Sequence, residues 1–479
     1  MQKNPFPHLL RPYFDWLSGH FEHLADEATR NQVRPDHIAH DFLSDERRRA
    51  NFNRYMMQEI KAAVLDFWSR NNEAIRSEII RLPGLKARFG GDIGPQPSQK
   101  LFERLGVYYD SIIVADPIVR SITTLGPAKR TDYYTLKYCI AHVLQRDVYL
   151  AEVYPPIAVL FAEQNLLEQK PYSVGPQSVI DATIVANKIF GQDFESERDA
   201  VEFFHKLGTS KAVADEVVDP DTFRFDESVG NDPLEQLEAL QNDLRRDWDE
   251  TQLPPQWRGS QLIWTVLVGR MMQANDLLHG AIEVGAHPVV QAPMSFHWLV
   301  TKIRATSDVL QQATRESYVV ELPITNALLS NQLDWLSNVP LDALMRIRSH
   351  GFLDDLRKTI SSNLSQAETA SYDQLERVCR QVDNNLQIAF NRHQEQIQTL
   401  NQTLIRRFAI AAPSLLLSIG GAIHPLLGGG LPPWISVAAT LGGTVSLTEL
   451  VSSVASNIVE RRRLGRTPVG ILWHARNEA

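Results

Sequence analysis

Three aspartates flank the two segments whose composition is most typical of β-strands. Residues 108–117 are rich in aromatic and β-branched side chains and stop at a proline, and residues 147–156 form a weaker second candidate. An α/β enzyme would place acid–base groups or metal ligands at the ends of such strands. The catalytic candidates are therefore Asp110, Asp116 and Asp147. Aspartate beside proline is also a common turn former, and this structural role is the favoured alternative.

Four histidines form two pairs with helical i, i+3 spacing, a pattern that could bring imidazoles together on one helix face. The metal candidates are His20, His23, His37 and His40. Neither pair belongs to an H-E-x-x-H or H-x-x-E-H motif, and nothing in the sequence brings the two pairs together. Exposed helix histidines are therefore the default expectation, and we expect no metal.

Other motifs of catalysis or cofactor binding are missing from the sequence. A glycine-rich stretch at residues 90–98 lacks both the G-x-G-x-x-G pattern and a following Lys-Ser/Thr, so we interpret it as a domain boundary and not as a phosphate loop. No G-x-S-x-G elbow surrounds a serine, and Cys139 and Cys379 have no motif around them. We expect no cofactor, and an enzyme would rest on the strand-end carboxylates alone.

Charge and cysteine content restrict the class of protein further. The net charge is −9 over 479 residues, which argues against nucleic acid as a partner. Two distant cysteines exclude a disulfide framework, and the N-terminus lacks the apolar segment of a signal peptide. These features predict a cytoplasmic protein.

The elements that would position these residues are mainly helical. Periodic apolar residues predict a multi-helix body with a minor α/β element near residues 107–155. Composition shifts and Pro/Gly clusters divide the chain into six regions. These are an N-terminal helical region (1–90), a mixed α/β to helical region (100–218), an acidic linker with a short helix (219–258), a second helical region (259–350), long amphipathic helices (352–407), and an apolar hairpin with a docking tail (408–479).

Residues 352–407 carry apolar side chains spaced by threes and fours, which predicts a long amphipathic helix or a helical hairpin of coiled-coil type. The seam is short in heptads and is interrupted by polar residues. An intramolecular hairpin is therefore favoured, with a protein partner or self-association through this segment as the alternative.

The most unusual segment is residues 408–448, which contain no Asp, Glu, Lys or Arg. A Pro- and Gly-rich break divides the apolar region 408–458 into two helices, whose principal apolar residues are Phe408, Leu415, Leu416, Leu417, Ile419, Trp434, Ile435, Val437 and Leu441. Arginines flank both ends, namely Arg406, Arg407, Arg461, Arg462 and Arg463. This arrangement suits a membrane hairpin with both termini on the cytosolic side.

A buried hairpin in the protein core is the alternative to membrane contact. The second helix contains Glu449 and many small polar residues, and an acidic residue inside a membrane costs about 2.5–3.5 kcal/mol on insertion scales. The hairpin is therefore only marginally suited to insertion.

Three functions follow from these features. The first is a non-enzymatic regulatory or effector protein whose helical body controls the hairpin at a membrane. The second is a cytosolic scaffold or interaction protein with the hairpin as core. The third is an enzyme that uses the strand-end carboxylates as acid–base groups or metal ligands.

Overall fold

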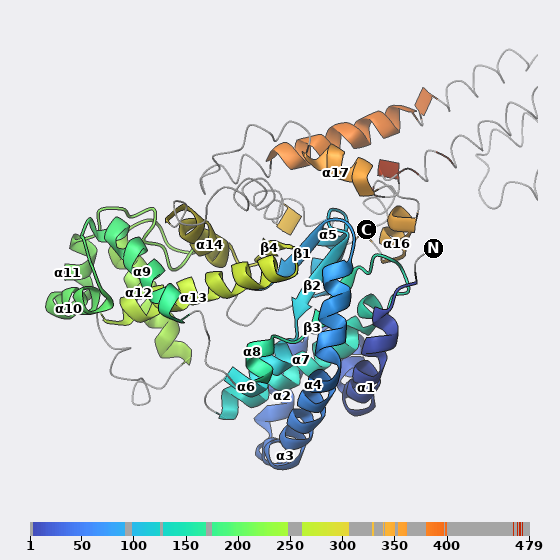
Figure 1. Cartoon of the computed structure of the whole chain (residues 1–479), viewed down its shortest axis with the longest axis horizontal. Helices are drawn as coiled ribbons and strands as arrows, with labels where there is room; N and C mark the ends of the chain where they lie inside the picture. Colours follow the sequence, from blue (N-terminus) through green and yellow to red (C-terminus); the bar gives the residue numbers. More distant parts are fainter. Residues whose placement is uncertain are drawn as a thin grey trace, which may run out of the picture. The chain divides into compact units, whose positions relative to one another are not determined.

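The computed structural model of the 479-residue chain describes residues 3–91, 98–124, 128–168, 175–247, 261–305, 341–349, 353–361 and 380–396, with a few isolated positions between 328 and 472. The chain forms two compact units: unit 1 comprises Met1–Ser337 with Asn363–Gln381, and unit 2 comprises Asn338–Ser362 with Val382–Ala479. Most described residues are helical, and a small parallel sheet lies in unit 1 (Figure 1). This agrees with the predicted mostly helical fold with a minor α/β element.

The sheet is built from four short parallel strands in the order β3-β2-β1-β4. Its strands are β1 (Lys86–Phe89), β2 (Ser111–Ala115), β3 (Ala158–Phe161) and β4 (His287–Val289). From β1 the chain moves outward to β2 and then β3, and it returns to the other side of β1 for β4. This reversal is the topological switch point of a doubly wound α/β sheet, where ligands commonly bind beyond the carboxyl ends of the strands.

Helices before and between the first three strands cover the sheet. The element order is α1 (Phe6–Asn31), α2 (Pro35–Ser44), α3 (Glu46–Asn51), the π-helical turn η1 (Phe52–Met56) and α4 (Met57–Arg81) before β1; α5 (Gln99–Gly106) before β2; and α6 (Pro117–Thr124) and α7 (Ala128–Tyr149) before β3. Helices α4 and α7 contact β3, α5 contacts β2, and α1 packs along α7. The sheet is therefore buried, as parallel sheets usually are.

Sequence signals explain the beginnings and ends of several of these elements. Asp45 accepts hydrogen bonds from the backbone N–H groups of Arg47 and Arg48, both at 2.9 Å, and so begins α3. At the end of α4, the ammonium group of Lys86 donates to the carbonyls of Ile79 and Ile80, both at 3.3 Å. A cation at a helix C-terminus stabilises the last carbonyls, so a lysine in a buried strand has a defined role here.

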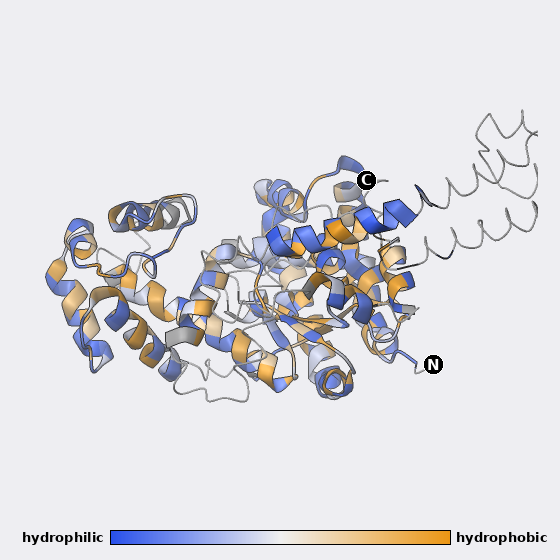
Figure 2. Ribbon diagram, turned by 90° about the horizontal axis from the view of Figure 1, so that it is seen from above, coloured by the Kyte–Doolittle hydropathy of each residue, from blue (hydrophilic) through white to orange (hydrophobic). Residues whose placement is uncertain are grey.

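A group of helices lies between β3 and β4. It comprises α8 (Gln164–Leu167), α9 (Gly175–Phe190), α10 (Glu197–Leu207), α11 (Ser210–Asp215), α12 (Pro233–Asp247) and α13 (Gln261–Glu283), and α14 (Pro293–Ala305) follows β4. Their apolar faces form a second core with several buried aromatic side chains, among them Phe190, Phe204, Phe223 and Trp298. Figure 2 shows hydrophobic and hydrophilic residues side by side on these helices, as expected for amphipathic helices with one buried face.

Helix α13 connects this helical group to the sheet. It contacts α9, α10 and α14 within the group, and it also packs against β1 and β4 (Figure 1). A shift of α13 would therefore change the packing both at the switch point and in the second core.

Unit 2 contains α16 (Leu341–Ser349), α17 (Leu353–Ser361) and helical residues 382–396. Residues of the predicted seam are buried there, including Leu356, Ile360, Val382 and Leu386. The side-chain amide of Asn385 donates to the carbonyl of Ile360 at 3.1 Å, so the polar seam residue joins two helical segments. The remainder of the predicted 352–407 region, like the apolar hairpin, lies outside the described residues.

The predicted strands differ partly from those observed. The segment 108–117 contains β2, but Tyr108 and Tyr109 belong to the turn that ends α5. The segment 147–156 is not a strand: residues up to Tyr149 complete α7, and the strand follows at β3. A short apolar run without alternation does not mark its own boundaries, which explains the displacement.

Candidate functional site

Charged side chains from separate elements meet at the carboxyl edge of the sheet. Arg88 comes from β1, Glu163 follows β3, Arg120 lies on the first turns of α6, and Asp276 lies in the middle of α13. We call these four residues the carboxyl-edge cluster. They line a pocket next to the switch point between β1 and β4, where the fold places a ligand site by rule.

Arg88 and Glu163 form the buried part of the cluster. Their side chains are 3% and 9% exposed, and Nη2 of Arg88 donates to Oε1 of Glu163 at 2.9 Å. The guanidinium also lies over the ring of Phe161, 4.8 Å from its centre. On the other side Gly280 of α13 leaves room for it, because a Cβ atom there would lie 3.2 Å from Nε of Arg88. The arginine is thus held rigidly between the sheet and α13.

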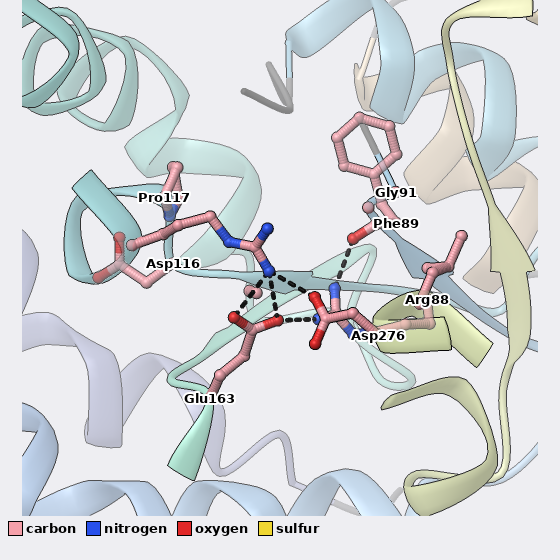
Figure 3. Close-up of a pocket in the computed structure, with 11 residues that line it drawn as sticks. Arg88, Phe89, Gly91, Asp116, Pro117, Glu163 and Asp276 are labelled. Atoms are coloured by element: carbon pink, nitrogen blue, oxygen red, sulfur yellow. Dashed lines mark hydrogen bonds and ion pairs between the residues drawn. The ribbon is translucent and has the colours of Figure 1, made fainter. Parts of the chain in front are cut away.

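Arg120 and Asp276 form the outer part of the cluster. Nη2 of Arg120 donates to Oε2 of Glu163 at 2.9 Å and to Oδ2 of Asp276 at 2.6 Å. The side chains of Arg120 and Asp276 are 24% and 19% exposed, so they meet solvent while Arg88 does not. Figure 3 shows the carboxylates of Glu163 and Asp276 pointing toward each other across these contacts. A single arginine therefore joins a residue next to the sheet to a residue on α13.

This arrangement shifts the pKa values of the two carboxylates in opposite directions. Burial raises the pKa of Asp276 above its ordinary value, and the negative charge of Glu163 adds to the rise. Burial acts on Glu163 in the same sense, but Arg120 and Arg88 outweigh it and lower the pKa of Glu163. Asp276 is consequently the carboxylate of the pair that is held less firmly in its ionised form.

Gly90 and Gly91 bring the backbone after β1 close to α13. Gly91 has a φ of +76°, and a Cβ atom there would lie 2.7 Å from Val290 and 2.9 Å from Leu277. Gly91 is thus required by its conformation as well as by its neighbours. The close approach packs the side chain of Leu277 against this backbone, and Leu277 lines the pocket together with the two glycines.

The pocket itself is narrow. The hollow has an accessible volume of about 10 Å³, which is room for about one water molecule. The cluster fills its own pocket with ion pairs, and an incoming molecule has to displace one of them. Asp276, at the mouth and with its raised pKa, is the partner most easily displaced.

Asp116, one of the predicted catalytic residues, also lines this pocket, but its carboxylate is used elsewhere. It accepts hydrogen bonds from Tyr13 (2.5 Å), from Trp68 (2.7 Å) and from the backbone N–H of Ile118 (2.8 Å), and it lies 3.1 Å from Nε2 of His142. The side chain is fully buried. Asp116 therefore ties α1, α4 and α7 to the end of β2.

The other two aspartates lie apart from this edge. Asp110 stands before β2, at the opposite end of the strand, and its carboxylate accepts from the backbone N–H of Leu85 at 2.6 Å. Asp147 is on the last turn of α7 with its side chain 86% exposed. The structure does not bring the three predicted catalytic carboxylates together.

The predicted metal candidates lie on α1 and α2. His20 contacts the carbonyl of Trp16 at 2.8 Å and Glu59 at 3.1 Å, while His23, His37 and His40 are exposed. Within the residues that the structure describes, no group of three or more His, Cys, Asp or Glu is arranged to hold a metal ion.

The predicted hairpin residues from Phe408 to Leu441 and their flanking arginines lie outside the described residues, except for Arg463, which is exposed. None of the described helices is both long and apolar enough to cross a membrane.

No family model, curated protein or solved structure matches this chain. Sequence reasoning did not find the carboxyl-edge cluster, because its members are spread over almost 190 positions from Arg88 to Asp276. The one local signal was the Gly-Gly pair directly after β1.

Proposed function

We propose that this protein is a regulator whose unit 1 binds a small molecule at the carboxyl-edge cluster and thereby controls the C-terminal hairpin, residues 408–458. The observation that carries the proposal is the convergence of two arginines and two carboxylates at the switch point of the parallel sheet. Burying several charged groups together costs desolvation free energy, so such a cluster indicates a role beyond stability. Charged groups with shifted pKa values also gather at functional sites.

The contacts of the cluster favour binding over chemistry. Both carboxylates are engaged by Arg120, and the carboxylate of Asp116 is engaged by other side chains. An arrangement of this kind can exchange one charged partner for another, which is what a sensor requires. The control of the hairpin rests on the sequence, where a marginally apolar hairpin follows long amphipathic helices and is flanked by arginines.

The test has a binding part and a membrane part, both with the full-length protein. The melting temperature of the protein is measured in the presence of each member of a panel of nucleotides, nucleosides, sugar phosphates and amino acids. Each compound that raises it is then added to a flotation assay with vesicles of mixed neutral and anionic lipid. We expect at least one compound to raise the melting temperature and to change the fraction bound to vesicles.

The matched control for the membrane part is Leu416→Asp, which places a charge in the first apolar segment and should abolish vesicle binding. A protein that ignores vesicles with and without every stabilising ligand, and whose hairpin is protected from protease, would instead be the scaffold with a buried hairpin.

An enzyme is the second candidate, and one observation favours it. The pKa values of Glu163 and Asp276 are displaced in opposite directions at one pocket, which is the pattern of an acid–base pair. This candidate predicts that a compound which stabilises the protein is also converted, and that Glu163→Gln abolishes conversion. Binding of an unaltered compound favours the regulator.

A further inference from the structure

The outer ion pair of the carboxyl-edge cluster has the properties of an internal competitor. The carboxylate of Asp276 occupies one side of the Arg120 guanidinium, 2.6 Å from Nη2. A phosphate oxygen would take the same kind of contact with the same geometry, since arginine binds carboxylate and phosphate alike. With about 10 Å³ of free volume, the pocket cannot hold both anions.

Resting on the proposed function, we infer that the ligand is a phosphate-bearing small molecule, and that its phosphate replaces the Asp276 carboxylate on Arg120. In the absence of ligand, the Asp276 carboxylate occupies the position of the phosphate. The exchange breaks the ion pair that joins α13 to α6.

Two observations support phosphate as the ligand group. Arg120 is partly exposed and Arg88 lies behind it, so an anion that displaces Asp276 faces two arginines and the single carboxylate of Glu163. The position beside β1, at the switch point of a doubly wound sheet, is where such folds hold phosphates.

The exchange changes the balance of charge in the cluster, and with it the protonation of Asp276. With Asp276 ionised, the two arginines are matched by two carboxylates, and the cluster is neutral. When a phosphate takes the place of Asp276 on Arg120, the Asp276 carboxylate loses its arginine partner while negative charge is added beside it, so it gains a proton more easily. Binding should therefore take up a proton near Asp276.

The exchange also gives the signal a path. Asp276 lies in the middle of α13, which contacts β1 and β4 at one end and α9 and α10 at the other. Loss of the contact with Arg120 removes the ion pair between α6 and α13. The helical group around α9–α13 would then be free to change its position on the sheet.

Calorimetric titration of pyrophosphate and of ATP into the full-length protein tests this inference. Asp276→Asn keeps the size of the side chain and removes the competing charge, so both probes should bind at least about tenfold more tightly. Arg120→Lys keeps the charge but loses the planar fork, and binding should weaken by at least about tenfold. The control is Glu283→Gln, which removes a carboxylate from the same helix outside the pocket and should leave affinity unchanged.

Proton uptake separates exchange from a general effect of charge. The phosphate of either probe also ionises near pH 6, so the ligand exchanges protons with the buffer in both proteins. Titrations at pH 6 in two buffers of different ionisation enthalpy should therefore show a net proton uptake that is larger for the wild type than for Asp276→Asn. Equal affinity of the wild type and Asp276→Asn, with binding still lost in Arg120→Lys, overturns the exchange but leaves the proposed site intact. If neither probe binds to the wild type or to Asp276→Asn while a neutral compound from the panel does, the phosphate class is wrong and the regulator stands. If nothing in the panel binds, the proposed function fails as well.

Discussion

Replacing Asp116 with alanine should destabilise unit 1 severely, although Asp116 is a poor candidate for catalysis. Its carboxylate lies at the end of β2 and accepts hydrogen bonds from Tyr13 on α1 and Trp68 on α4, and it contacts His142 on α7. It also accepts from the backbone N–H of Ile118, in the first turn of α6. One side chain thus holds the helices of the N-terminal layer on the sheet.

The magnitude follows from what the alanine variant leaves behind. A hydrogen bond to a charged group contributes about 1.5–3 kcal/mol, and a buried donor left without a partner costs a similar amount. The individual losses do not add, because the donors share one carboxylate. Removal of one member of a buried charged network costs about 3–5 kcal/mol, which we take as the expected loss of unfolding free energy for Asp116→Ala. The urea slope grows with the surface exposed on unfolding and exceeds the value of small proteins in a chain of this size, so the midpoint should fall by roughly 0.5–1 M.

The assay is urea unfolding of the full-length protein, followed by circular dichroism, with Asp147→Asn as the control. Asp147 is also a predicted catalytic carboxylate, but it is 86% exposed and lies 3.8 Å from the guanidinium of Arg146. Its replacement should change the unfolding free energy by less than about 0.5 kcal/mol. Equal midpoints for the two variants would refute the structural role assigned to Asp116.

Two further predictions concern β4 and the Gly-Gly turn. Burial lowers the pKa of His287 to about 4 from 6.5, so the unfolded chain binds this proton more tightly and the free energy of unfolding falls as the pH drops from 6.5 to 4. In urea titrations at several pH values, His287→Gln should flatten this part of the curve of stability against pH. An unchanged curve would contradict the burial effect. Gly91→Ala should lower the melting temperature more than Gly208→Ala. Both glycines have positive φ and share a backbone cost of about 1–2 kcal/mol, but the added Cβ meets neighbours only at Gly91. Equal shifts would show that the approach of Val290 and Leu277 is relaxed at no cost.

The sequence predicted the elements with strong local signals. The β-branched run that contains β2 and the helical region 259–350 that contains α13 were both expected near their observed positions. The strands β1 and β4 carry lysine, arginine, histidine and proline, and residues of these types do not look like a buried strand. Their positions depend on partners such as the end of α4, which binds Lys86, and local patterns do not contain that information.

The site was less predictable than the fold for a related reason. Asp116 was found because it lies between a strand and a proline, but the same signal does not reveal that its carboxylate faces helices and not the pocket. Arg88, Arg120 and Asp276 become neighbours only because the chain, after β3, returns to the other side of β1 and adds β4 there. A ligand cluster built across a switch point is a property of topology, so it becomes visible only in three dimensions.

Calorimetric titration of pyrophosphate into the full-length wild type and its Arg120→Lys and Asp276→Asn variants tests the carboxyl-edge cluster most directly. We predict weak binding to the wild type, weaker binding to Arg120→Lys and tighter binding to Asp276→Asn. The same affinity in all three proteins would contradict the assignment of the ligand site to Arg120.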